Sequence, residues 1–234
     1  MPSTPAISHA SDSERLPGLF VVLEGIDGCG STTQAKLLAA AIRSRGAQVV
    51  LTCEPSSGPI GALIRQVLQH RLLATDATTP HHFDWSTMAL LFAADRMDHL
   101  AATVLPALRS GAVVISDRYD LSSLAYQSLT AQPSSDPIPW IRELNARALR
   151  PDLTIVLDVP AELAEERRRA RGGVEEMFEK RELQARLATV YARAEQLVPE
   201  DRVLHVSGAG ELKEVAERLL DAVISAASGY FQGL

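Results

Sequence analysis

A glycine-rich loop near the start of the chain has the residue types that phosphate binding needs. Glycines stand at positions 25, 28 and 30, after an apolar segment and before a helical pattern of apolar residues. Glycine lets backbone N–H groups approach phosphate oxygens, and the N-terminus of the following helix adds partial positive charge. The spacing fits the pattern G-x-x-x-x-G-K-[ST], with Thr32 at the hydroxyl position that binds Mg²⁺ and Ser31 at the lysine position. An ordinary strand-to-helix turn is the alternative that the rest of the chain must exclude.

Five apolar segments are expected to form the strands that position this loop. They cover residues 19–23, 48–52, 112–116, 153–157 and 203–206, and long helical patterns separate them. Such alternation predicts an α/β fold with a mostly parallel sheet covered by helices on both faces. Ligands of these sheets bind beyond the carboxyl ends of the strands, so polar residues directly after the strands are candidate site residues.

Composition limits the class of protein. The 234 residues are 46% hydrophobic and 22% charged, which is typical of a soluble globular domain. No apolar run reaches the roughly 18 residues of a membrane-spanning helix, and a net charge of −6 argues against general nucleic-acid binding. The only cysteines, Cys29 and Cys53, indicate a reducing compartment, so we expect a cytoplasmic protein. We expect a disordered tail over 1–18, a folded domain over 19–227 and a C-terminal tail over 228–234.

Polar motifs follow the expected strands in a specific order. They are E-G-I-D-G-C-G-S-T-T-Q at 24–34, E-P at 54–55, L-F-A-A-D-R at 91–96, D-R-Y-D-L-S-S-L-A-Y-Q at 117–127 and R-P-D-L-T-I-V-L-D-V at 150–159. Together these segments resemble the thymidylate kinase family, whose members phosphorylate dTMP with ATP. The resemblance covers about residues 19–227.

The resemblance implies a P-loop nucleoside monophosphate kinase fold with a five-stranded parallel sheet and a mobile LID over about 167–176. It implies Mg²⁺ as the cofactor, with Thr32, Asp117 and Glu179 as metal-site candidates, and Asp27, Arg118, Arg168 and Arg171 as catalytic candidates. The arginine-rich segment also fits a charged surface helix. The residues expected to bind the ATP phosphates are Gly25, Ile26, Asp27, Gly28, Cys29, Gly30, Ser31, Thr32 and Thr33.

The resemblance also implies a dTMP site and a homodimer. Phe92 is expected to stack on thymine, Arg96 to contact an exocyclic oxygen of the base, and Arg65 with Arg118 to hold the acceptor phosphate. A solvent-facing role for Arg65 stays open. Tyr126 is expected to crowd the ribose 2′ position. The full set expected to bind dTMP is Glu54, Arg65, Phe92, Arg96, Arg118, Ser123, Tyr126 and Gln127.

Ser31 is the main departure from the family pattern. The lysine normally found there places a positive charge on the β- and γ-phosphates, and Lys36 lies more than one helical turn further on. Three outcomes are open: LID arginines supply the charge, catalysis is slow, or the chain is a nucleotide-binding pseudokinase. We expect retained activity because the acceptor-side residues are intact. A kinase for another nucleoside monophosphate is the remaining alternative.

Overall fold

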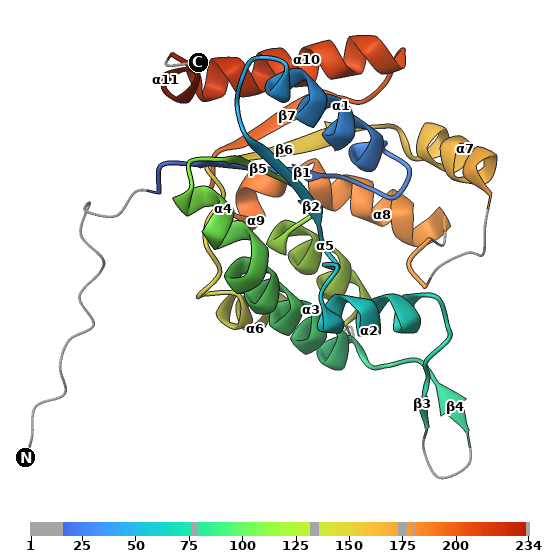
Figure 1. Ribbon diagram of the computed structural model, residues 1–234. Coiled ribbons are helices and arrows are strands. Elements are labelled where there is room, and N and C mark those ends of the chain that lie inside the picture. Colours follow the sequence, from blue (N-terminus) through green and yellow to red (C-terminus); the bar gives the residue numbers. More distant parts are fainter. Residues whose placement is uncertain (1–15, 76–78, 132–135, 173–176, 180, 233–234) are drawn as a thin grey trace, which may run out of the picture.

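The computed structural model describes residues 16–75, 79–131, 136–172, 177–179 and 181–232 (Figure 1). Most of the expected N-terminal tail (1–15), part of the expected LID (173–176) and the last two residues of the expected C-terminal tail lie outside the described residues. Residues 16–18 of the expected tail are described, and the Gly18 N–H donates to the Leu108 carbonyl at 2.9 Å.

The core of the fold is a parallel five-stranded sheet in the order β2-β5-β1-β6-β7, as expected for the α/β class. The strands are β1 (Leu19–Glu24), β2 (Val49–Cys53), β5 (Val113–Asp117), β6 (Leu153–Asp158) and β7 (Val203–Ser207). All six residues of the central strand β1 are buried, because helices cover both faces of the sheet (Figure 1).

Alternate residues of β1 face opposite layers. Val21 belongs to the hydrophobic cluster that includes Leu38 of α1 (Ser31–Arg43) and Leu219 of α10 (Leu212–Ala226). Phe20 belongs to a second cluster, with Leu108 of α4 (Leu105–Arg109). This two-sided burial explains why the strand is a continuous apolar run rather than an alternating one.

Most of the other helices lie below the sheet in Figure 1, whereas α7 lies beside it and α11 lies above it at the end of α10. They are α2 (Pro59–Leu68), α3 (Trp85–His99), the π-helical turn η1 (Leu100–Val104), α5 (Asp120–Thr130), α6 (Pro137–Leu144), α7 (Ala161–Arg171), α8 (Arg181–Tyr191), α9 (Ala194–Leu197) and α11 (Ser228–Phe231). Within the described ranges, no helix combines the length and apolar character needed to cross a bilayer.

Two short features had no signal strong enough for the sequence to predict. Strands β3 (Ala74–Thr75) and β4 (Pro80–His81) form a small antiparallel hairpin between α2 and α3. Helix α11 lies inside the expected C-terminal tail, and the Tyr230 hydroxyl donates to the Gly111 carbonyl at 2.7 Å. Elements of two to four residues carry too little periodicity to be predicted.

Candidate active site

The glycine-rich loop joins β1 to α1 at the carboxyl edge of the sheet, and α7 packs directly against it. Gly28 and Gly30 have φ angles of 90° and 97°, a region that favours glycine. A Cβ atom on Gly28 would lie only 2.3 Å from the Ala164 carbonyl oxygen of α7. Both backbone conformation and close packing therefore require glycine at position 28.

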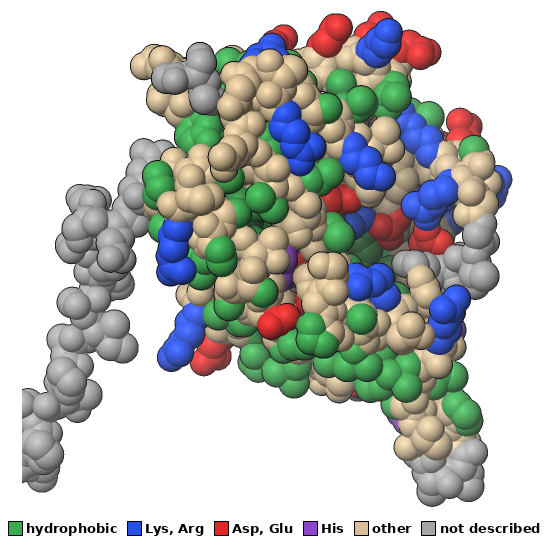
Figure 2. All heavy atoms as spheres, viewed as in Figure 1, with side chains coloured by type: hydrophobic (Ala, Val, Ile, Leu, Met, Phe, Trp, Pro, Cys, Tyr) green, Lys and Arg blue, Asp and Glu red, His purple; other side chains and the backbone are tan. Residues whose placement is uncertain are grey.

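A cavity of about 630 Å³ opens over this loop, which is within the range of small-molecule sites. Loop residues 27–33 line it together with Gln34, α7 and the segment after β7. Lys36 is exposed and is not among the lining residues. The arginines of the lining are Arg118, Arg167, Arg168 and Arg171. Figure 2 shows basic and acidic side chains gathered at the hollow beside α7.

Two α7 arginines reach the loop through backbone carbonyls. Arg168 donates to the Asp27 carbonyl. Arg167, which the sequence did not single out, donates to the carbonyls of Cys29 and Gly208 at 3.1 Å each. Arg171 lines the same cavity, and its guanidinium pairs with Glu179 at 2.7 Å. Arg168 and Arg171, the two candidates from the sequence, thus line the cavity, and Arg167 lines it as well.

Thr32 and Asp117 meet in the corner between α1 and β5. The Thr32 hydroxyl donates to Asp117 Oδ2 at 2.5 Å, and the buried Asp117 Oδ1 has no hydrogen-bond partner among the described residues. A hydroxyl and an unsatisfied carboxylate oxygen are hard ligands that suit Mg²⁺ arriving with its phosphates. Within the described residues, no group of three His, Cys, Asp or Glu side chains is placed to hold a metal ion by itself. Glu179 lies against Arg171, so its proposed place near the metal stays a prediction.

A second, smaller cavity of about 130 Å³ lies beside the first. Asp27 and Arg118 line both cavities. The other residues expected to bind the acceptor that line it are Glu54, Phe92, Arg96, Ser123, Tyr126 and Gln127. Arg65 does not line it; its Nη1 donates instead to the carbonyls of Pro55 and Ser56, at 2.9 and 2.6 Å. The structure gives Arg65 a role in holding the loop after β2.

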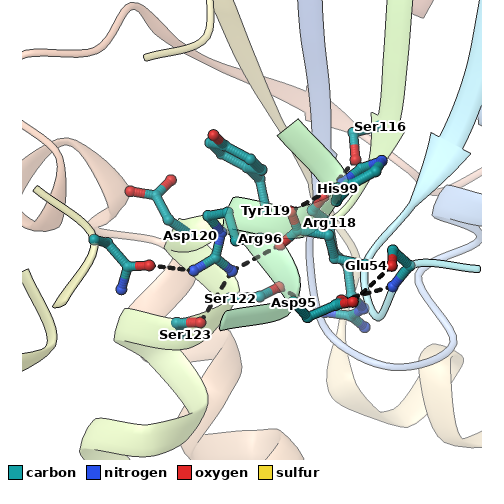
Figure 3. A network of polar contacts seen from close by, with 12 residues as sticks. Glu54, Asp95, Arg96, His99, Ser116, Arg118, Tyr119, Asp120, Ser122 and Ser123 are labelled. Atoms are coloured by element: carbon teal, nitrogen blue, oxygen red, sulfur yellow. Dashed lines mark hydrogen bonds and ion pairs between the residues drawn. The ribbon is translucent and has the colours of Figure 1, made fainter. Parts of the chain in front are cut away.

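Arg96 of the smaller cavity is held by side chains from several segments (Figure 3). It is 1% exposed and pairs with Glu54 at 2.7 Å, while its Nη2 donates to Ser123 Oγ at 3.1 Å. It also donates to Asn145, and its guanidinium lies over the Tyr119 ring. Its Nε has no hydrogen-bond partner in the described structure.

Gln127 Oε1 is a second buried polar atom of this cavity without a hydrogen-bond partner in the described chain. An unsatisfied buried donor or acceptor costs free energy that a polar ligand would recover. The Arg96 Nε donor and the Gln127 Oε1 acceptor therefore point to a ligand that presents both acceptor and donor groups, as the edge of a nucleobase does.

Arg118 joins the two cavities. Its Nη2 pairs with Asp27 Oδ1 at 2.5 Å, and its Nη1 donates to the Gly25 carbonyl at 3.0 Å. The guanidinium also lies over the Tyr126 ring, 5.2 Å from the ring centroid. The φ angle of Arg118 is 75°, an uncommon backbone conformation for a residue other than glycine, and such strain concentrates at functional sites.

Several side chains that organise the site were not selected from the sequence. Glu24 is fully buried and accepts hydrogen bonds from the Tyr119 N–H at 2.8 Å and the Ser122 hydroxyl at 2.6 Å. Burial raises the pKa of Glu24 to about 7, although the charge of Arg118 opposes the shift. The sequence signal that could have identified Glu24 is a carboxylate residue directly at the end of an apolar segment.

Phe178 and Gln184 were also missed. The Phe178 ring lines the smaller cavity and lies 5.5 Å from the Tyr126 ring. Gln184 is buried and contacts Asp27. Neither has a distinctive sequence signal, because an aromatic or an amide on a helical segment is usually structural.

Comparisons with known proteins agree with this geometry. The family model for thymidylate kinase matches residues 23–219. A probable thymidylate kinase of Pyrococcus abyssi is 41% identical over 206 residues, covering 88% of this chain and 96% of that protein. A probable thymidylate kinase of Pyrococcus horikoshii is 41% identical over 188 residues, covering 80% and 88%. A thymidylate kinase of Geobacter sulfurreducens is 42% identical over 154 residues, covering 66% and 69%.

Proposed function

This chain belongs to the thymidylate kinase family, and we propose that it transfers the γ-phosphoryl group of ATP to dTMP, yielding ADP and dTDP. The observation that carries this proposal is that two cavities of different character meet at Asp27 and Arg118. Phosphoryl transfer between two nucleotides requires the donor and acceptor phosphates to be held together with their charge neutralised.

The larger cavity suits the donor. Its glycine loop offers backbone N–H groups at the start of α1, and its arginines offer positive charge. Thr32 and Asp117 would hold Mg²⁺, which neutralises phosphate charge when bound. The protein's own contribution is to fix these groups before the nucleotide binds, so that little reorganisation accompanies the reaction.

The smaller cavity suits the acceptor. Phe92 offers an aromatic face, and Arg96 Nε and Gln127 Oε1 offer an unsatisfied donor and acceptor. Arg118 offers a guanidinium where the acceptor phosphate would approach the loop, a geometry suited to binding phosphate oxygens in pairs. Asp27 lies beside it as the carboxylate nearest the transferring group.

We infer that Ser31 stands at the position of the phosphate-loop lysine and that arginines supply its charge. In support, Ser31 lines the donor cavity while Lys36 does not, and Arg167 and Arg168 cross from α7 to the loop. The pseudokinase alternative has no support among the relatives or in the site.

Steady-state turnover with ATP, Mg²⁺ and a panel of dTMP, dUMP, dCMP and thymidine tests the proposed function. We expect dTMP to have the highest kcat/KM, and Asp27→Ala to remove most of the dTDP formed. A wild-type rate no higher than that of Asp27→Ala would overturn the proposal. A preference for another monophosphate would leave a kinase but reject dTMP as the acceptor.

We further propose that the chain forms a homodimer through α2 and α3. Large hydrophobic side chains are exposed there, with Leu63, Leu90 and Met97 at 40%, 50% and 41% exposure. Figure 2 shows hydrophobic side chains gathered over this lower surface. A second copy of the chain would cover this face. Single scattered hydrophobic side chains need no partner, whereas a continuous patch of them marks an interaction surface.

Light scattering on the full chain tests the dimer. We expect Met97→Glu to halve the mass of the wild-type species, and Leu212→Glu, which charges an even more exposed hydrophobic on α10, to leave the mass unchanged. A monomeric wild type would reject the interface.

Both cysteines are free, which supports a reducing compartment, and we propose a cytoplasmic location.

A further inference from the structure

Gln184 of α8 makes an unusually complete set of contacts with the site. Its Oε1 accepts the Asp27 N–H at 2.9 Å, and its Nε2 donates to Asp27 Oδ2 at 2.8 Å. The same Nε2 donates to the Phe178 carbonyl at 2.7 Å. The side chain is fully buried, so water cannot replace any of these bonds without opening the structure.

Each oxygen of the Asp27 carboxylate is bound by a side chain from a different part of the fold. Arg118 pairs with Oδ1 at 2.5 Å, and Gln184 holds Oδ2. Asp27 lies on a glycine-rich loop, where neither helix nor strand restrains its side chain. Arg118 and the neutral amide of Gln184 therefore help to orient it toward the junction of the two cavities.

The third contact extends this restraint to the acceptor cavity. The Phe178 ring lines that cavity and packs beside Tyr126. Because one amide group binds both Asp27 and the Phe178 backbone, the wall of the acceptor cavity and the donor loop are joined through Gln184.

We infer that Gln184 is a positioning residue for phosphoryl transfer, which holds the Asp27 carboxylate toward Arg118 and fixes Phe178 against the acceptor cavity. The inference rests on the proposed function. Gln184 acts through Asp27 and Phe178 and need not touch either substrate.

Gln184→Leu replaces the amide with an apolar side chain of similar size and removes all three bonds. We expect kcat to fall by about 10- to 100-fold, as for loss of one well-placed polar group. The KM for dTMP should rise more than the KM for ATP, because Phe178 lies on the acceptor side.

Gln184→Glu gives a sharper result, because it keeps the size and the acceptor but places a second carboxyl group against Asp27. Like charges disfavour ionisation of both groups. Activity relative to wild type should therefore be lowest above about pH 8 and recover toward about pH 6, where a shared proton restores a donor. A role limited to helix packing would not produce this pH dependence.

Leu187→Val is the matched control, because Leu187 is fully buried one turn along the same helix. It should lower stability while leaving the pH profile and the KM ratio unchanged. Equal kinetic effects in Gln184→Leu and Leu187→Val would overturn the inference, as would a Gln184→Glu profile parallel to that of wild type. If Gln184→Leu does not fold, the Gln184→Glu profile decides. A wild type that makes no dTDP rejects the proposed function itself, whereas normal turnover with unaffected Gln184 variants rejects only this inference.

Discussion

The buried carboxyl group of Glu24 should make the stability of this protein depend on pH. Glu24 ends β1, is fully buried, and accepts bonds from the Tyr119 and Ser122 N–H groups and from the hydroxyls of Ser122 and Tyr191. Removal from water raises the pKa of Glu24 from 4.5 to about 7, and Arg118 and the hydrogen bonds only partly oppose this shift.

The sign of the effect follows from the raised pKa. Between about pH 4.5 and pH 7 the folded protein binds the Glu24 proton more tightly than the unfolded chain does. The contribution to the free energy of unfolding is therefore fully present below pH 4.5 and is lost as the pH rises through about 7. At about 1.4 kcal/mol for each pKa unit, the loss amounts to roughly 3 kcal/mol.

Glu24→Gln isolates this contribution, because the amide has the shape of the protonated acid and cannot ionise. Its oxygen can accept the two N–H groups, and its NH₂ can donate to the hydroxyls of Ser122 and Tyr191. Urea unfolding of both proteins from about pH 4.5 to about pH 8 gives the difference in free energy of unfolding. We expect wild type to lose roughly 3 kcal/mol relative to the variant across that range.

Other titrating groups affect both proteins alike, so only the difference between them reports on Glu24. A difference that does not vary with pH would show that Glu24 keeps an ordinary pKa in the folded state. A difference that varies in the opposite direction would show that the hydrogen bonds and Arg118 outweigh burial. Either result would refute the reasoning.

Three further substitutions probe the site. Arg118→Lys removes the planar fork that binds Asp27 and a loop carbonyl together, and steady-state kinetics should show kcat lower by about 10²- to 10³-fold; a loss below tenfold would contradict this. Glu54→Gln leaves Arg96 buried without its counter-charge, and urea unfolding should show a loss of about 3–5 kcal/mol, against no loss if Arg96 is otherwise neutralised. Gly28→Ala places a Cβ 2.3 Å from a carbonyl of α7, and calorimetry should show ATP binding weakened more than about tenfold, whereas unchanged affinity would show that α7 moves aside.

The sheet was predictable because its strands are buried on both faces. The expected strands agree with those observed to within one residue: each observed strand ends one residue later, and β2 and β5 also begin one residue later. Glu24, Asp117 and Asp158 end the apolar pattern but not the ladder, since Glu24 still pairs with Val156 and Asp158 with Ser207. A polar residue stays in a buried strand only when distant segments supply its partners, and the sequence does not show those segments.

The site was predictable where the topology alone brings residues together. Parallel strands end at one edge, so the loop after β1 and the polar residues after β5 had to meet there. The roles of Arg65 and Gln184 depend on contacts that this rule does not determine. Arg65 binds backbone carbonyls ten residues or fewer away, while Gln184 binds Asp27 across 157 residues. Side-chain partners of this kind are decided by packing, which no spacing pattern encodes.

The partners of the α7 arginines bear on how the donor cavity functions with Ser31. The described lining contains four arginines and one carboxylate, Asp27. Arg167 and Arg168 bind backbone carbonyls in the loop region, which satisfy hydrogen bonds without cancelling charge. Their positive charge is therefore available to phosphate oxygens, as a lysine's would be.

A double-mutant cycle tests whether this charge replaces the lysine. If Arg168 already supplies it, Ser31→Lys should change kcat by less than about threefold in wild type, because the added cation duplicates an existing one. Arg168→Met should lower kcat by about 10²-fold, and Ser31→Lys should restore most of that loss in the double variant. Independent effects of the two substitutions would show that they act on different parts of the reaction. A large gain in kcat from Ser31→Lys alone would show that the α7 arginines do not replace the charge of the missing lysine.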